Sequence, residues 1–363
     1  MNNNNNERSS LIENRRFTSH GFTDQLSRLR ENDPYFTNLI LRLDTMERDS
    51  SQNFPHWRDA IFSHQLSQWV EAIQTNNSIE SVIVDMTVSD TTIWEKRQCY
   101  KLLNAIGALP CLEKLEFYQS VLGEPGRMGS IAAITQAVQN TRLLMHLAMT
   151  GKTVREGSEE ELGALVNAFQ QCRHLESLSI IGFQLSKSHV AIFSPILRMQ
   201  SLKKLHFENT SNAFVPLIEM LSTNARLTTL ILEFKDQLVD VTVVQLADVL
   251  KVNRTLQDLS LLNSTFLART ESLTNPSGIS EQGYRALREM TEQNFVLQHM
   301  NVQGLLDADI DFYLKLNRAG RQRLFESSDS SPKNWVTMIA KVAEDPECIF
   351  YFLQLNPSLC DVF

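Results

Sequence analysis

The residues of this sequence that could do recognition chemistry lie in short alternating triplets. Lys114, Glu116 and Tyr118 alternate with apolar residues, and the stretch Lys204–Glu208 repeats this pattern with a lysine, a histidine and a glutamate. A β-strand points alternate side chains to one face, so each triplet would present its polar groups together. A tyrosine flanked by charged side chains is typical of protein recognition. The triplets therefore predict a surface that binds another protein.

The sequence does not contain the complete motifs of a nucleotide site, a metal site or a nucleophile elbow. The string Met149–Thr153 contains Gly-Lys-Thr, but a phosphate loop needs a further glycine where this chain has His146. The eight histidines are scattered, with no HxxxH pair, and no G-x-S-x-G nucleophile elbow occurs. We therefore predict no catalytic residues, no cofactor and no metal, and expect that the protein is not an enzyme.

The elements that would position the triplets come from an internal repeat. The stretch Leu256–Leu261 reads L-x-x-L-x-L, and the same pattern, with other apolar residues in places, returns at intervals of 25 to 41 residues by subtraction. A weaker copy begins at Phe36. The repeats begin at Ile79, Leu112, Leu144, Leu175, Leu202, Leu227, Leu256 and Leu297.

Each repeat is predicted to consist of a short strand, a turn and a helix. The period of two in L-x-L predicts the strand, and a helical period predicts helices over residues 55–75, 94–109 and 131–138. Ser158 and Glu161 have the spacing of a capping box at another helix start. Asparagines before five repeats are predicted to end helices, since asparagine tolerates the left-handed conformation. These are Asn76, Asn140, Asn224, Asn253 and Asn294.

From about Phe36 to Gly304 the chain resembles the leucine-rich-repeat family, and the long helices resemble its ribonuclease-inhibitor-like subfamily. This resemblance implies an α/β solenoid shaped like a horseshoe, with a parallel sheet on the concave face and helices on the convex face. The stretches Leu316–Gly320, Cys348–Leu353 and Asn356–Cys360 resemble the tail of leucine-rich-repeat proteins of unicellular algae.

Three segments are expected. Residues 1–32 are polar and predicted to be disordered, apart from a helical turn within Asp24–Arg30 that would cover the first repeat. Residues 33–304 form the repeat domain, with loops at 119–130 and at the long insertion 264–278, which is either a tolerated surface loop or a partner contact. Residues 305–363 are apolar enough to form a helical cap over the end of the leucine core.

Charge and cysteine usage narrow the class of protein. A net charge of −8 and a pI near 5.6 argue against a general nucleic-acid or anionic-membrane binder. The five cysteines form no CxxC, no apolar signal core opens the chain, and no run long enough to span a membrane occurs. We expect an intracellular monomer in the cytoplasm, with the nucleus as an alternative.

The repeat register predicts three rows of side chains across the concave sheet. They run from Asn38 to His299, from Ile40 to Asn301 and from Arg42 to Gln303, and they mix polar with aliphatic residues. Each of these residues is either a solvated strand residue or part of a binding surface. The candidate partner-binding residues are Lys114, Glu116, Tyr118, His146, Ile181, Lys204, His206, Glu208, Ile231, Glu233 and Leu262.

These observations predict a non-catalytic scaffold that binds a protein through its concave face. Two alternatives share parts of the pattern. The activator of the Ran GTPase has the same fold, although it typically ends in a long acidic tail and this chain ends in an apolar segment. Substrate receptors of ubiquitin ligases carry such repeats after a helical adaptor-binding box. Residues 1–35 are too short and too polar for such a box.

Overall fold

A computed structural model describes most of the repeat region and much of the chain that follows it. The described residues are 22–43, 60–61, 66–86, 96–119, 131–150, 158–182, 191–209, 215–234, 240–263, 279–302, 307–326 and 332–357.

The strands form one curved parallel sheet, in the order β10-β9-β8-β7-β6-β5-β4-β3-β1-β2. Each neighbour beyond β2 is the next repeat in sequence, as in a solenoid. The strands are β1 (Asn38–Leu43), β2 (Ala60–Ile61), β3 (Ser81–Met86), β4 (Lys114–Gln119), β5 (His146–Thr150), β6 (Ser177–Ile181), β7 (Lys204–Asn209), β8 (Thr229–Phe234), β9 (Asp258–Asn263) and β10 (His299–Val302).

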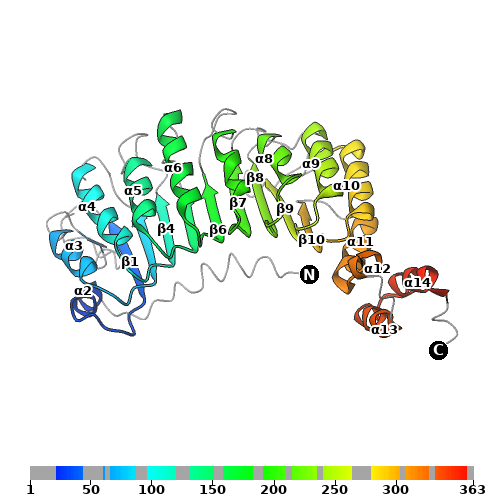
Figure 1. Cartoon of the computed structure of the whole chain (residues 1–363), viewed down its shortest axis with the longest axis horizontal. Coiled ribbons are helices and arrows are strands. Elements are labelled where there is room, and N and C mark those ends of the chain that lie inside the picture. The colour runs from blue at the N-terminus through cyan, green and yellow to red at the C-terminus, as the bar shows by residue number, and fades with distance from the viewer. Residues whose placement is uncertain are drawn as a thin grey trace, which may run out of the picture.

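Helices cover the outer side of the arc, and the strands line its inner side (Figure 1). This arrangement is that of a leucine-rich-repeat solenoid, as the repeat predicted. The helices are α2 (Phe22–Arg30), α3 (Leu66–Gln74), α4 (Lys96–Gly107), α5 (Ile131–Asn140), α6 (Glu159–Gln171), the 3-10 helix η3 (Ser194–Arg198), α8 (Val215–Leu221), α9 (Asp240–Val252), α10 (Glu281–Gln293), α11 (Ala308–Ala319), α12 (Gln322–Glu326), α13 (Pro332–Lys341) and α14 (Pro346–Leu355).

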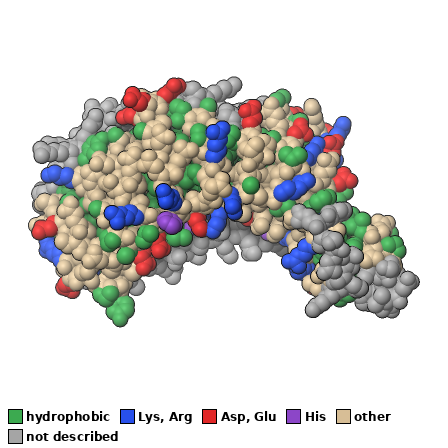
Figure 2. All heavy atoms as spheres, in the orientation of Figure 1, with side chains coloured by type: hydrophobic (Ala, Val, Ile, Leu, Met, Phe, Trp, Pro, Cys, Tyr) green, Lys and Arg blue, Asp and Glu red, His purple; other side chains and the backbone are tan. Residues whose placement is uncertain are grey.

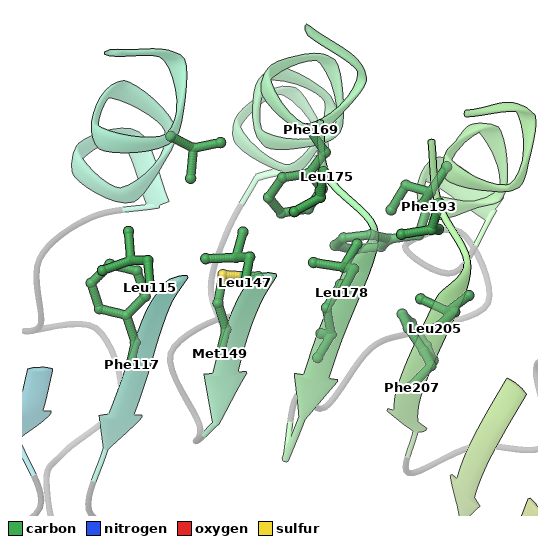
Figure 3. Close-up of a cluster of buried hydrophobic side chains, with 14 of the residues drawn as sticks. Leu115, Phe117, Leu147, Met149, Phe169, Leu175, Leu178, Phe193, Leu205 and Phe207 are labelled. Atoms are coloured by element: carbon green, nitrogen blue, oxygen red, sulfur yellow. The ribbon is translucent and has the colours of Figure 1, made fainter. Parts of the chain in front are cut away.

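The core is a continuous layer of apolar side chains between the sheet and the helices. Leu115, Leu147, Leu178 and Leu205 occupy equivalent positions in neighbouring strands and point toward the helices, each at most 1% exposed (Figure 3). Such a layer forms only when repeats stack, because one strand and one helix cannot bury their apolar faces alone. The predicted capping box is confirmed: the Glu161 amide donates to Ser158, and the Ser158 amide donates to Glu161.

A ladder of buried asparagines joins successive repeats in the turns that lead from the helices into the strands. The side-chain nitrogen of Asn253 donates to the carbonyls of Leu221 and Asn224, and its side-chain oxygen accepts from the backbone amides of Thr255 and Leu256. Asn76, Asn224 and Asn294 bond in the same way. Such side chains satisfy backbone groups that would otherwise be buried without partners.

The explanation predicted for these asparagines was wrong. Among the described residues only Asn32 has a positive φ outside glycine, so none of the five ends a helix in the left-handed conformation. Asn140 is exposed and lies one residue before the ladder position, which Thr141 occupies in that repeat. In the next repeat Cys172 takes the position, and its thiol donates to the Val138 carbonyl at 3.6 Å.

One further prediction differs at the N-terminal end. Ala60 and Ile61 lie in strand β2 beside Arg42 and Leu43, and helix α3 begins only at Leu66, although one helix was expected over residues 55–75. The backbone groups of an open sheet edge pair readily with a short strand, and this pairing overrides the helical pattern at Ile61.

Helix α2 confirms the helical turn predicted within Asp24–Arg30, in a segment that was otherwise expected to be disordered. Its Leu29 is fully buried and Leu26 packs against the same core, so the helix covers the first repeat. The Leu29 carbonyl accepts from Asn76, which joins this helix to the ladder. Asp33 follows the helix, and the backbone amide of Tyr35 and the guanidinium of Arg28 lower the pKa of its carboxyl.

Helices α11 to α14 form a second apolar cluster at the other end of the arc (Figure 1). Helix α11 serves both clusters: Ile310 and Leu314 join the repeat core, whereas Leu316 and Ala319 face Trp335 and its neighbours on α13 and α14. The segment expected to form a helical cap contains the helices α13 and α14. Asp345 and Pro346 mark the break before α14, because Asp345 caps this helix and Pro346 forms its first turn.

Arg321 fastens this cluster to the last repeat. Its side chain is 0% exposed and donates to the carbonyls of Thr291 and Asn294 and to the side chain of Asn317, each at 2.9 Å. The guanidinium also lies 4.7 Å from the ring centre of Phe295. Asn317 in turn donates to the Asn294 carbonyl, so the ladder continues into the C-terminal helices. Gly320, with φ of 109°, makes the left-handed turn that ends α11 before α12 begins.

An ion pair links α11 to the start of α14, and we expect its titration to make the C-terminal helices sensitive to acid. Lys315 lies 3.1 Å from the Asp345 carboxylate, which also caps α14 by accepting from the Cys348 amide. Lys315 and then this amide lower the pKa of Asp345 below the usual range of an aspartate. A lowered folded pKa means that the stabilisation is complete near neutral pH and disappears as the pH falls below about 4.

We predict that Asp345→Asn makes the stability of the C-terminal helices depend less on pH, so that less of it is lost between about pH 5 and pH 3. Hydrogen exchange of α14 amides, followed across this range, measures that loss locally. Glu347→Gln is the control, because it removes an exposed carboxylate from the same helix without touching Lys315. Equal pH dependence in the wild type and in Asp345→Asn would show that this ion pair does not control the acid response.

Candidate functional site: the concave face

The predicted rows of side chains are aligned in the structure as the repeat register required. The first row passes from Lys114 to His146, Ser177 and Lys204, and the second passes from Glu116 to Ala148, Ser179, His206 and Ile231. In the third row, Tyr118 pairs with Thr150 and then Ile181, and Glu208 pairs with Glu233 and then Leu262. Side chains from β4 to β9 therefore share one surface.

A hydrogen-bonded triad occupies the N-terminal half of this surface. The Lys114 ammonium lies 2.8 Å from one Glu116 oxygen, and the Tyr118 hydroxyl donates to the other at 2.7 Å. All three belong to β4, and the pleat brings them to one side of the strand. The carboxylate thus fixes the tyrosine ring and the lysine in one arrangement, with Lys114 and Tyr118 half-buried. A preordered aromatic and cationic pair loses little side-chain entropy on binding.

A second pair lies three strands further along the sheet. His206 on β7 and Glu233 on β8 are joined by a 3.0 Å contact between Nε2 and Oε1. Ile231 neighbours His206 across the strands and is half-buried, while Lys204 at the start of β7 is exposed. This part of the face therefore combines an aliphatic side chain with an exposed cation.

Three of the predicted contact residues are buried. Glu116, Glu208 and Glu233 are 8%, 6% and 5% exposed. Neighbouring strands lie about 4.8 Å apart, so long side chains pack against the next row rather than extending into solvent. These glutamates position their neighbours. Among the predicted contact residues, His146 and Lys204 are exposed. Lys114, Tyr118, Ile181, His206, Ile231 and Leu262 are each partly exposed.

A cleft of about 850 Å³ between α10, α11 and α14 was not among the predicted sites. Phe312, Tyr313 and Tyr351 form its aromatic wall, and Phe312 stands edge-to-face to Tyr351 with ring centres 5.9 Å apart. Carboxylates from three helices and Arg288 surround it, but Arg288 is bonded to Asp307 at 2.7 Å. The sequence offered only the apolar character of this tail as a signal, since the cleft depends on how the helices pack.

The potential metal ligands in the described part of the chain are not grouped together. Within it, no group of three His, Cys, Asp or Glu side chains is placed to hold a metal ion. Burial raises the pKa of both the Cys172 and Cys348 thiols to about 11, so neither is a thiolate near neutral pH. Among the same residues, no helix combines the length and apolarity needed to cross a membrane.

Several segments that follow strands lie outside the described residues. They include the Gly-Lys-Thr string after β5, residues 120–130 and the insertion 264–278. The predictions made for them, and for residues 1–21, therefore remain predictions. So does the contribution of Gln303 to the third row.

Solved structures that resemble the chain include two distant ones. No protein-family model matches the chain, and no curated protein matches it. Leiomodin-1 actin-binding site 2 shares 12% identity and a TM-score of 0.31, covering 57% of this chain and 100% of that one. The tropomodulin C-terminal domain of Caenorhabditis elegans shares 10% identity and a TM-score of 0.26, covering 63% of this chain and 93% of that one. Likeness at this level adds no argument about the site.

Proposed function

We propose that this chain is a non-catalytic scaffold that binds a protein partner through the concave face of its solenoid. The observation that carries the proposal is the aligned surface from β4 to β9, where one tyrosine, three aliphatic side chains and two lysines share one face. Tyrosine and partly desolvated charge are typical of interface centres, and curved repeat surfaces offer a large area to one partner.

The geometry supports protein recognition over chemistry. The concave carboxylates are held by neighbours, as Glu116 is by Lys114 and Tyr118, so they act as braces for the contact residues. An active site would need acid, base or nucleophile converging on one reacting atom. We infer from the wide, shallow spread of these groups that the protein is not an enzyme.

The proposal extends to the subclass of the repeat, the compartment and the oligomeric state. We place the chain in the ribonuclease-inhibitor-like subclass, since α6, α9 and α10 each span 13 residues on the outer face. We also propose an intracellular monomer, in the cytoplasm or the nucleus. The clustered-cysteine caps of extracellular repeat proteins are missing from the sequence, and both described ends of the solenoid carry helices instead.

The test uses affinity capture from the native cell with a concave variant. Tyr118→Ala combined with Ile231→Ala removes two partly exposed anchors and leaves the buried glutamates in place. We expect partner recovery to fall about tenfold or more, which corresponds to about 1.4 kcal/mol of binding free energy.

A matched control separates binding from folding. Val241→Ala with Val252→Ala removes two exposed apolar side chains, 68% and 60% exposed, from the outer helix α9. The control is expected to retain every partner, and circular dichroism should show equal helix content in both variants. If the concave variant keeps its partners, or if both variants lose them, the proposed binding face is wrong.

A further inference from the structure

Charge is distributed unevenly over this acidic protein. The five turns that lead from α5, α6, η3, α8 and α9 into the next strands, with each first strand residue, cover 141–146, 172–177, 199–204, 224–229 and 253–258. They hold six Lys or Arg residues and two carboxylates, which leaves four net positive charges in a chain whose net charge is −8. The six cations are Arg142, Arg173, Lys203, Lys204, Arg226 and Arg254.

These cations form one exposed row, here called the basic edge. All six are exposed, and His146 and His174 are exposed beside them. Lys203 pairs with Glu176 at 2.7 Å, whereas the other five have no ion pair with a carboxylate in the part of the chain that the structure describes. Figure 2 shows Lys, Arg and His side chains gathered near the middle of the visible face, with carboxylates frequent along its upper, helical margin.

The turns are close enough for their cations to act together. Lys203 reaches Glu176 in the preceding turn, and Arg226 donates to Gln200 of the turn before it at 3.3 Å. Turns one repeat apart follow the strand spacing of about 4.8 Å, so the row is about 20 Å long. Like charges at such distances repel each other in the unbound protein. An anionic ligand along the edge would relieve this repulsion.

We propose that the basic edge binds an extended acidic segment of the protein partner, a conclusion that rests on the proposed scaffold function. At about 3.3 Å per residue, a chain of about six residues spans the 20 Å row. Alternate Asp or Glu side chains of that segment would face the guanidinium groups of Arg142, Arg173 and Arg254. The edge adjoins the first concave row at His146 and Lys204, so one partner can contact both surfaces.

A labelled peptide of about ten alternating Glu and Ser residues is the probe, followed by fluorescence anisotropy. We expect saturable binding to the full chain that weakens as salt is added, because exposed charges are screened. Arg142→Glu, Arg173→Glu and Arg254→Glu together should weaken binding at least about tenfold. The control, Lys101→Glu with Arg285→Glu and Lys341→Glu, makes the same change in net charge on helices elsewhere and should bind like the wild type.

Three outcomes would overturn the inference. They are no saturable binding of the acidic peptide by the wild type, equal loss in the control, and preference for a single-stranded oligonucleotide of equal charge, which would identify a nucleic-acid surface. Partner capture separates this inference from the scaffold proposal. If the partner is lost from Tyr118→Ala with Ile231→Ala but kept by the triple arginine variant, the scaffold proposal stands and the acidic-segment inference is wrong. If both variants keep the partner, both proposals are wrong.

Discussion

Replacing Asn294 with alanine is expected to lower the free energy of unfolding by about 3 to 5 kcal/mol. Asn294 is fully buried, and its amide donates to the carbonyls of Leu250 and Asn253 while its oxygen accepts from Val296 and Leu297. Alanine cannot replace any of these four bonds, so backbone groups of two repeats would be left buried without partners. The large effect follows from desolvation of the remaining groups rather than from lost apolar area.

Urea unfolding of the wild type and Asn294→Ala measures this difference. Asn140→Ala is the matched control, because Asn140 is exposed and lies one residue outside the ladder. We expect its effect to stay within about 0.5 kcal/mol. A similar effect of both substitutions would mean that the ladder does not hold the repeats together.

Replacing Arg321 with alanine is expected to detach the C-terminal helices from the last repeat, at a cost of about 3 to 5 kcal/mol. The guanidinium supplies hydrogen bonds to two backbone carbonyls and to Asn317, and it packs on the rings of Phe295 and Tyr313. Burial lowers the pKa of Arg321, yet an arginine stays charged at neutral pH. The same charge is therefore costly to bury and necessary once the site is built.

Hydrogen exchange distinguishes this local opening from global unfolding. We expect α13 and α14 to exchange much faster in Arg321→Ala while α6 remains protected, because repeats unfold from their ends. Arg321→Lys should fall between, since an ammonium cannot reproduce the planar set of donors. Arg318→Ala removes an arginine from the last turn of α11 whose bond to the Gln298 carbonyl is exposed to solvent, so it should leave protection nearly unchanged. Uniform loss of protection in Arg321→Ala would contradict a local role.

The repeat pattern predicted the sheet well, for a physical reason. Each L-x-x-L-x-L stretch commits its leucines to one core, and a parallel stack then has a single register that buries them all. The alignment of Lys114 with His146 and Lys204, across unrelated loop lengths, follows from that constraint alone. The capping box at Ser158 was predictable because it is a local interaction.

Contacts between repeats were harder to predict. The ladder asparagines were visible in the sequence, but their partners are carbonyls about 30 residues away, as Asn253 shows with Leu221. The burial of Glu208 and Glu233 depends on the packing of adjacent rows, which spacing does not reveal. Arg321 looked like an ordinary charged residue, and only the fold places the Thr291 carbonyl beside it.

Site-specific photo-crosslinking tests directly whether a protein partner occupies the concave face. A photoreactive amino acid placed at Ile231 on β8, or at Val241 on the outer helix α9, is activated in the native cell. We expect one discrete crosslinked partner from Ile231 and none from Val241. The reverse pattern, or the same adducts from both positions, would contradict binding through the concave face.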